Sequence, residues 1–244
     1  MNFDFITSSH LAYIMGLSPN FVIIFVITAV VSWLVSHTLK RRFNEYSQIS
    51  VRYTGAQIAE IMLRENGIND VQVISTPGKL TDHYDPKTRT VNLSESVYAM
   101  NTIAAAAVAA HECGHAIQHQ KAYMWLTMRS KMVPAVQFAG TTLNIIMIAG
   151  MFGAAVFHTP IFLYIWVGLF ALTTLFAFVT LPVEFDASTR AIVWLGKSGV
   201  SSSMDHRKAE NALFWAAMTY VVAALGSLAM LLYYVSMLLG RREE

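Results

Sequence analysis

Three long windows without a charged residue constrain this chain more than any other feature. Residues 11–39, 132–183 and 211–240 contain no Asp, Glu, Lys or Arg. A helix needs about 20 apolar residues to cross the hydrocarbon core of a bilayer. The middle window has 52 residues and can therefore hold two such helices. Because 55% of all residues are hydrophobic and only 13% are charged, the sequence predicts an integral membrane protein that is mainly α-helical.

We expect four transmembrane helices in these windows. Their predicted ranges are 21–39, 133–157, 161–181 and 212–239. Pro182 should end the third helix, because proline removes a main-chain hydrogen bond of the helix. Residues 40–131 and 182–211 then lie outside the bilayer, and the whole chain, 1–244, forms a single membrane-embedded domain.

Basic residues give the predicted helices an orientation. Lys40, Arg41 and Arg42 follow the first span directly, and the positive-inside rule places them in the cytoplasm. The remaining spans then put residues 40–131 and 182–211 on that same side, together with 15 of the 17 Lys and Arg residues. We therefore expect a multi-pass protein of the cell membrane in which both polar segments face the cytoplasm.

The segment 40–131 has the pattern of a small α+β domain at the membrane edge. Thr54 and Gln57 have the spacing of a capping box, at the start of a helix that should end near Gly67. VQVIS predicts a strand, and TRTVNL predicts one arm of a hairpin that turns near residues 85–88. That arm, just ahead of the next helix, could bind an extended peptide along a free edge, or the hairpin could simply cover a core. The sequence leaves both possibilities open.

The stretch TIAAAAVAAHECGHAIQHQ, residues 102–120, predicts a helix that carries a metal-binding pair. Its alanine run has high helix propensity. Four residues advance an α-helix by about 400°, so His111 and His115 lie about 40° apart and one turn offset, and both imidazoles can reach one metal ion. In such an H-E-x-x-H pattern the two histidines bind Zn²⁺, and Glu112 is the general base for a water that the metal activates.

The residues around the pair support a buried helix. Ala104–Ala110 favour burial over the alternative, a polar helix face that meets water or lipid headgroups. Cys113 lies about 200° around the helix from each histidine, and we interpret it as a small packed residue, not as a ligand or nucleophile. Gly114 costs helix stability of about 1 kcal/mol relative to alanine, which is sensible where another element packs closely.

Two histidines leave a zinc ion short of a third protein ligand. The candidates are Glu184, Asp186, His119, His83 and His206. His119 would extend the histidine row along the helix axis instead of closing around the ion. Glu184 follows the third span in apolar surroundings, where a carboxylate is costly unless it is paired or bound to a metal. We therefore expect Glu184 as the third ligand, with Asp186 as the second choice.

Together these residues resemble those of known membrane proteases. HECGH followed, after an apolar helix, by EFDAS resembles the gluzincin proteases of the HtpX and CAAX-prenyl-processing type. TGAQIAEIMLRENGINDV, KLTDHYDPKTRTVNLS, AAHECGHAIQ and LPVEFDASTRA are similar to blocks of the YugP-type membrane zinc metallopeptidases, from Val51 to the fourth span. The resemblance implies a zinc metalloprotease of a bacterial plasma membrane, with His111, His115 and Glu184 as ligands.

The sequence departs from the HtpX pattern after Glu184. Asp186 stands two residues further on, and Ser188 occupies the fourth place. We therefore do not expect either residue to orient a ligand histidine.

The expected function is that of a zinc-dependent endopeptidase acting on membrane or membrane-proximal proteins. Its partners would be a peptide or membrane-protein substrate and membrane lipid; a formal charge of +2 with scattered basic residues disfavours nucleic acid. Candidates for stabilising the oxyanion are Tyr84, His83, Arg190 and His206. The alternative is a non-catalytic zinc-binding scaffold or chaperone. A metal transporter is disfavoured, because the predicted spans carry no carboxylate for a translocation path.

Overall fold

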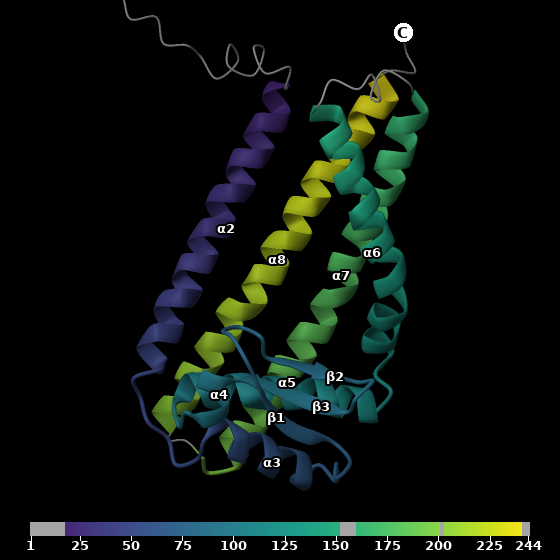
Figure 1. The fold of residues 1–244 in the computed structure, drawn as a ribbon. Coiled ribbons are helices and arrows are strands. Elements are labelled where there is room, and N and C mark those ends of the chain that lie inside the picture. The colour runs from purple at the N-terminus through teal and green to yellow at the C-terminus, as the bar shows by residue number, and fades with distance from the viewer. Residues whose placement is uncertain (1–17, 152–159, 201–202, 241–244) are drawn as a thin grey trace, which may run out of the picture. The chain divides into compact units, whose positions relative to one another are not determined.

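The computed structural model of the chain describes residues 18–151, 160–200 and 203–240 and is mostly helical (Figure 1). In chain order its elements are α2 (Pro19–Tyr46), α3 (Gly55–Glu65), β1 (Gln72–Thr76), β2 (His83–Asp85), β3 (Thr90–Ser94), α4 (Glu95–Ala99), α5 (Ile103–Gln120), α6 (Met124–Met151), α7 (Pro160–Lys197) and α8 (Ser203–Gly240). Residues 152–157, the end of the second predicted span, lie outside the described residues.

Four of these helices are long and apolar enough to cross a membrane. They comprise Pro19–Tyr46, Met124–Ala149, Ile161–Lys197 and Asp205–Gly240. The predicted fold class, four candidate spans with a small α+β part, is thereby confirmed. The helices are longer than the predicted spans, because their polar ends continue the helices instead of forming loops.

The prediction that Pro182 ends the third span is wrong, since α7 continues through it to Lys197. Proline in a helix interior costs about 3 kcal/mol. Val179, Val183 and Ala187 lie on one face around it and are almost fully buried. Tyr123, between α5 and α6, donates its hydroxyl proton to the Pro182 carbonyl at 3.5 Å. Burial of this face stabilises the helix across the proline.

The chain divides into two compact units. One contains the described residues of 18–34, 132–178 and 221–240, and the other contains 35–131 and 179–220. We call them the apolar unit and the site unit. In the apolar unit, α7 and α8 are joined by a hydrogen bond of 2.6 Å between the hydroxyls of Thr174 and Ser227. All candidate site residues named above belong to the site unit.

The site unit contains a three-stranded mixed sheet of order β1-β3-β2. β3 pairs in parallel with β1 and antiparallel with β2, which confirms the predicted strand and hairpin. All five residues of β3 are buried. The suggestion that the strand ahead of the metal helix offers a free edge is therefore wrong, because both edges of β3 are paired. Within the part of the chain that the structure describes, the outer edges of this sheet belong to β1 and β2.

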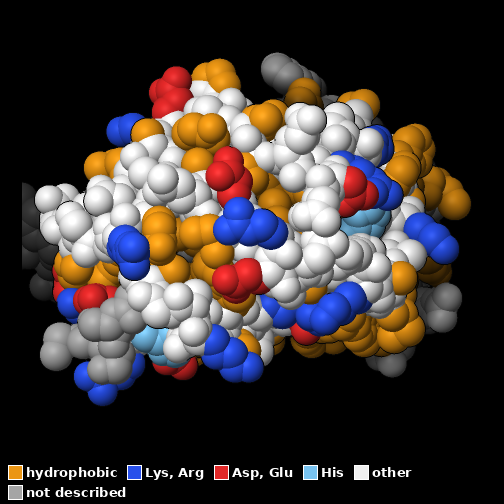
Figure 2. Space-filling model, turned by 90° about the horizontal axis from the view of Figure 1, so that it is seen from below, with side chains coloured by type: hydrophobic (Ala, Val, Ile, Leu, Met, Phe, Trp, Pro, Cys, Tyr) orange, Lys and Arg blue, Asp and Glu red, His pale blue; other side chains and the backbone are white. Residues whose placement is uncertain are grey.

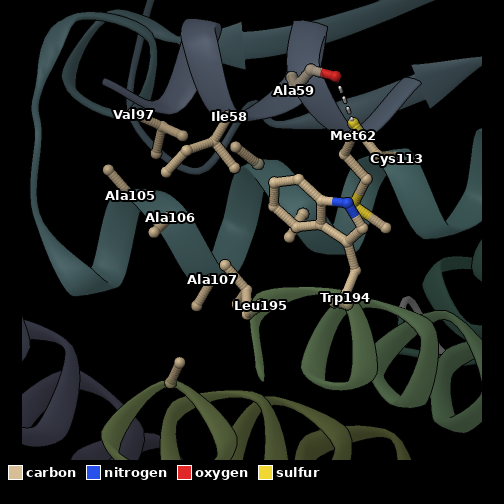
Figure 3. Packing of buried hydrophobic residues seen from close by; sticks show 14 of the residues in the cluster. Ile58, Ala59, Met62, Val97, Ala105, Ala106, Ala107, Cys113, Trp194 and Leu195 are labelled. Carbon is tan, nitrogen blue, oxygen red and sulfur yellow. Dashed lines mark hydrogen bonds between the residues drawn. The ribbon is translucent and has the colours of Figure 1, made fainter. Parts of the chain in front are cut away.

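The core of the site unit lies where α3 packs on α5 (Figure 3). Ile58 and Met62 of α3 meet the alanine face of α5, and Trp194 closes the cluster from α7. The expected capping box is present at the start of α3, where the side chains of Thr54 and Gln57 each bond the other's backbone N–H. The face shown in Figure 2 mixes basic, acidic and apolar side chains, as a surface in contact with water does.

Candidate metal centre

His111 and His115 both lie on α5, a mostly buried helix of the site unit. The helix begins at Thr102, whose side-chain oxygen accepts a hydrogen bond from the Ala105 N–H at 3.3 Å. Nearly every residue from Ile103 to Gln118 is buried, as the alanine run predicts. The pair therefore lies on a helix that is held rigidly by its surroundings.

Glu184 of α7 meets both histidines of α5. Its Oε2 atom lies 3.3 Å from His111 Nε2 and 3.7 Å from His115 Nε2. The Glu184 side chain is only 3% exposed. Among the described residues these three form a group that could hold a metal ion, with ligand atoms all within 4.8 Å of one another. No other candidate third ligand belongs to this group.

The geometry of the group fits zinc. A tetrahedral zinc ion with bonds of about 2.0–2.1 Å sets its ligand atoms roughly 3.3 Å apart, close to the two distances found. Two imidazole nitrogens and one carboxylate oxygen are also a donor set that suits zinc. A buried carboxylate is costly without a positive partner, and a metal ion at this point would supply one.

Gln118, which the sequence analysis did not select, fixes the orientation of His115. Its Nε2 group donates to the Val183 carbonyl and to Asp186 Oδ2, both at 2.8 Å. Because both amide protons are engaged, the Oε1 atom faces His115 Nδ1, at 3.0 Å. His115 must then donate from Nδ1, which leaves the Nε2 lone pair free for a metal. The signal in the sequence was the spacing of three residues from His115, which places Gln118 next to it on the helix.

Asp186 and Ser188 both support the histidines, and the expectation that neither does so is wrong. Asp186 holds Gln118 and is itself held by Arg190, with Nε to Oδ2 at 2.6 Å and Nη2 to Oδ1 at 3.2 Å. The Ser188 hydroxyl lies 3.1 Å from His111 Nδ1. Once α7 is helical at this point, residues two and four places after Glu184 can face the same neighbour.

Glu112 is buried, with 8% exposure, and is not part of the ligand group. Burial by itself lowers the pKa of His115, but the Glu184 and Glu112 carboxylates outweigh burial and raise that pKa above its ordinary value. Glu112 thus lies close enough to His115 to act on it electrostatically.

Cys113 and Gly114 serve packing, as their positions predicted. Burial, and after it the charge of Glu112, raises the pKa of the Cys113 thiol well above its ordinary value. The thiol donates to the Ala59 carbonyl at 3.6 Å (Figure 3). A Cβ atom on Gly114 would lie 2.6 Å from the Ala187 carbonyl oxygen and 3.0 Å from its Cα. Glycine therefore permits the close approach of α5 and α7 that brings Glu184 to the histidines.

The other candidates make different contacts. His119 Nδ1 lies 2.8 Å from the Tyr84 hydroxyl, His83 Nδ1 lies 2.7 Å from the Thr81 carbonyl, and His206 Nε2 lies 2.9 Å from the Ile192 carbonyl. With Arg190 bound to Asp186, all four residues suggested for the oxyanion are engaged elsewhere. Arg129 and Tyr220, by contrast, lie beside Glu184 and were not predicted. They are about 55 and 36 residues away from Glu184 in the chain, so no local pattern pointed to them.

Comparison with known proteins gives a consistent result. The family model described as "Putative neutral zinc metallopeptidase" matches residues 21–239. The chain is 39% identical over 215 residues to "Putative membrane protease YugP" of Bacillus subtilis (strain 168), which covers 87% of this chain and 94% of that protein. No solved structure matches the chain. The resemblance seen in the sequence is thus confirmed, and the chain belongs to the family described as putative neutral zinc metallopeptidases.

Proposed function

We propose that this protein is a zinc-dependent membrane endopeptidase that hydrolyses peptide bonds of membrane or membrane-proximal proteins. Membership of the family, the name of the Bacillus relative and four helices able to cross a membrane support this proposal. The observation that carries it is the meeting of Glu184 Oε2 with the Nε2 atoms of His111 and His115, beside a buried glutamate that is not a ligand.

His111 Nε2, His115 Nε2 and Glu184 Oε2 would hold the zinc ion. When bound there, zinc supplies a Lewis acid that makes water a better nucleophile and polarises a peptide carbonyl. Ser188 and Gln118 keep the two imidazoles turned so that their Nε2 atoms face Glu184.

Glu112 is the proposed general base. It follows His111 directly on α5, and its carboxylate is shielded from water by its surroundings. It would accept a proton from the attacking water and later donate that proton to the nitrogen of the leaving amine. The alternative is a zinc-binding scaffold or chaperone. A structural metal site needs no general base next to its ligands, so the effect of substituting Glu112 distinguishes the two functions.

We also propose that the site faces the cytoplasm of the cell membrane. Lys40, Arg41 and Arg42 on α2 belong to the same compact unit as the metal group. Basic clusters at the end of a span are retained in the cytoplasm. Substrates would then be membrane proteins or segments that approach the bilayer from that side.

The test compares the wild type with Glu112→Gln, which keeps the size and removes the base. Both proteins are expressed in cells, and new peptide N-termini are counted in isolated membranes while zinc is measured on the purified proteins. We expect both to bind zinc, and we expect cleavage to fall by about 10²–10⁴-fold in the variant. Glu60→Gln, an exposed position on α3, is the matched control and should cleave normally. If Glu112→Gln retains zinc and yields the same new termini as the wild type, the peptidase function is lost and the scaffold function is favoured.

A further inference from the structure

The proposed function leaves one requirement without a residue. During peptide hydrolysis the carbonyl oxygen becomes negative, and preorganised hydrogen-bond donors close to that oxygen stabilise the charge. Two donor-bearing side chains beside Glu184, Arg129 of α6 and Tyr220 of α8, have no role in holding the histidines. Both belong to the site unit.

Arg129 approaches the carboxylate oxygen of Glu184 that does not meet the histidines. Its Nη2 atom lies 3.9 Å from Glu184 Oε1, whereas Oε2 is the atom that meets the imidazoles. A separation of 3.9 Å is too long for a hydrogen bond. The guanidinium is therefore attracted to the carboxylate by charge, but Nη2 does not donate a hydrogen bond to it. Its Nε atom is buried and has no hydrogen-bond partner in the described part of the chain. The side chain is nevertheless 33% exposed, so a substrate could reach it.

Tyr220 brings a second donor to the same place. The charges of Glu184, Arg129 and Glu112 all act on its hydroxyl, which therefore lies in the neighbourhood of these three side chains. The residue as a whole is 38% exposed. Because the residue is partly exposed, its hydroxyl can turn its proton toward an incoming oxygen.

The electrostatics of the group favour an anion at this position. A zinc ion held by one carboxylate and two neutral histidines would leave a net positive charge, and the positively charged Arg129 guanidinium lies 3.9 Å from that same carboxylate. In a partly buried site the two positive charges repel, and a negative oxygen placed near both relieves that repulsion. The unpartnered Nε–H of Arg129 is a donor that such an oxygen would satisfy.

We propose that Arg129 and Tyr220 form the anion-binding part of the active site and bind the scissile carbonyl oxygen as it becomes negative. This inference rests on the proposed peptidase function and adds the two residues that make it efficient. It replaces the four oxyanion candidates drawn from the sequence, each of which is bound elsewhere in the site unit.

The test measures anion binding directly, so that it does not depend on cleavage. The full-length protein in detergent is loaded with Co²⁺, and inorganic phosphate is titrated while the visible absorption of the cobalt is followed. We expect phosphate to perturb the wild-type spectrum, and its affinity to fall at least about tenfold in Arg129→Met and severalfold in Tyr220→Phe, with cobalt content unchanged. Arg129→Lys should retain part of the affinity. The exposed Arg64→Met on α3 is the matched control and should bind phosphate as the wild type does.

The outcomes separate this proposal from the peptidase function. Wild-type phosphate affinity in Arg129→Met and Tyr220→Phe would overturn the anion-binding role, as would a wild-type cobalt spectrum that phosphate leaves unchanged. Loss of cobalt from Tyr220→Phe and Arg129→Lys, the two variants least prone to misfolding, would also overturn it and show that both residues only support Glu184. Weakened phosphate binding in a protein that cleaves nothing would leave this proposal intact and contradict only the peptidase function.

Discussion

Helix α5 and the last turns of α7 both contribute to the metal group, but they are held in different ways. α5 is enclosed by α3 and its neighbours, starts at a capped residue and is buried along almost its whole length. The α7 segment from Val179 onward continues through a proline and meets α5 at a polar joint. The difference teaches that the histidines are fixed by the packing of their whole helix, while the position of Glu184 depends strongly on how α7 meets α5.

Four contacts make up that joint. Gly114 allows the Ala187 backbone to approach, Ser188 lies next to His111, and Gln118 donates to both the Val183 carbonyl and Asp186. Each involves one residue of α5 and one of α7, and none involves the Glu184 carboxylate. Changes at the joint should therefore weaken zinc binding without removing a ligand, in proportion to how far they move α7.

Gly114→Ala should have the largest effect. The new Cβ would meet Ala187 backbone atoms at 2.6 Å and 3.0 Å, and backbone cannot rotate away as a side chain can, so α7 must move. We expect zinc affinity, measured by competition with a chelator, to fall by about 100-fold or more, together with a lower melting temperature. Gly140→Ala is the control, because a Cβ there meets nothing within 4 Å. Wild-type affinity in Gly114→Ala would show that the joint does not set the position of Glu184.

Gln118 substitutions should rank next. Gln118→Ala frees the imidazole of His115 and leaves the Val183 carbonyl and Asp186 without their donor. We expect a loss of zinc affinity of about 10–100-fold. Gln118→Glu retains an acceptor for His115 but places a second carboxylate beside Asp186, so it should be no better than alanine.

Gln120→Ala, an exposed change on the same helix, is the matched control and should leave zinc affinity unchanged. If Gln118→Glu binds zinc as the wild type does, the orienting role depends on the acceptor alone, and Asp186 has no part in it.

Ser188→Ala should have a smaller effect than either. It removes one neutral hydrogen bond, from a hydroxyl to His111 Nδ1, which is worth about 0.5–1.5 kcal/mol. We therefore expect zinc affinity to fall by roughly two- to tenfold. Thr189→Ala, one residue further along and bonded only to its own helix, serves as the control. An effect as large as that of Gln118→Ala would mean that the two histidines are supported equally.

Cys113 lies on the packed side of α5 and should affect zinc least. Because burial raises the pKa of its thiol, the reactive thiolate forms only at a pH above the ordinary range for cysteine. We expect negligible labelling by iodoacetamide at pH 8 in the folded protein and rapid labelling in denaturant. Cys113→Ala should keep zinc affinity within about twofold of the wild type. Fast labelling of the folded protein would show that this side of α5 is more open than its contacts with α3 indicate.

Local patterns were enough to predict α5 and its histidine pair. An alanine-rich helix fixes the angle between residues four apart, so His111 and His115 had to share a face. The capping box of α3, β1 and the hairpin follow equally from short-range rules, and the structure contains all of them.

The contacts that complete the site depend on packing between distant segments. The destabilising effect of Pro182 on a helix can be predicted from the sequence. The burial of Val183 and Ala187, which offsets that effect, depends on tertiary packing and cannot be. The sequence predicted a loop after Pro182. Ser188 comes next to His111 only because α7 stays helical there, so this contact could not be predicted. Arg129 and Tyr220 reach Glu184 from two other helices, so neither could be found by spacing from the H-E-x-x-H segment.

The central claim is that Glu184 completes a zinc site begun by His111 and His115, and zinc content tests it most directly. Zinc per chain is measured by mass spectrometry on purified wild type, Glu184→Ala and His119→Ala after dialysis against a weak chelator. We expect one zinc per chain in the wild type and in His119→Ala, and loss of zinc from Glu184→Ala. Stoichiometric zinc in Glu184→Ala, with loss from His119→Ala, would contradict the assignment.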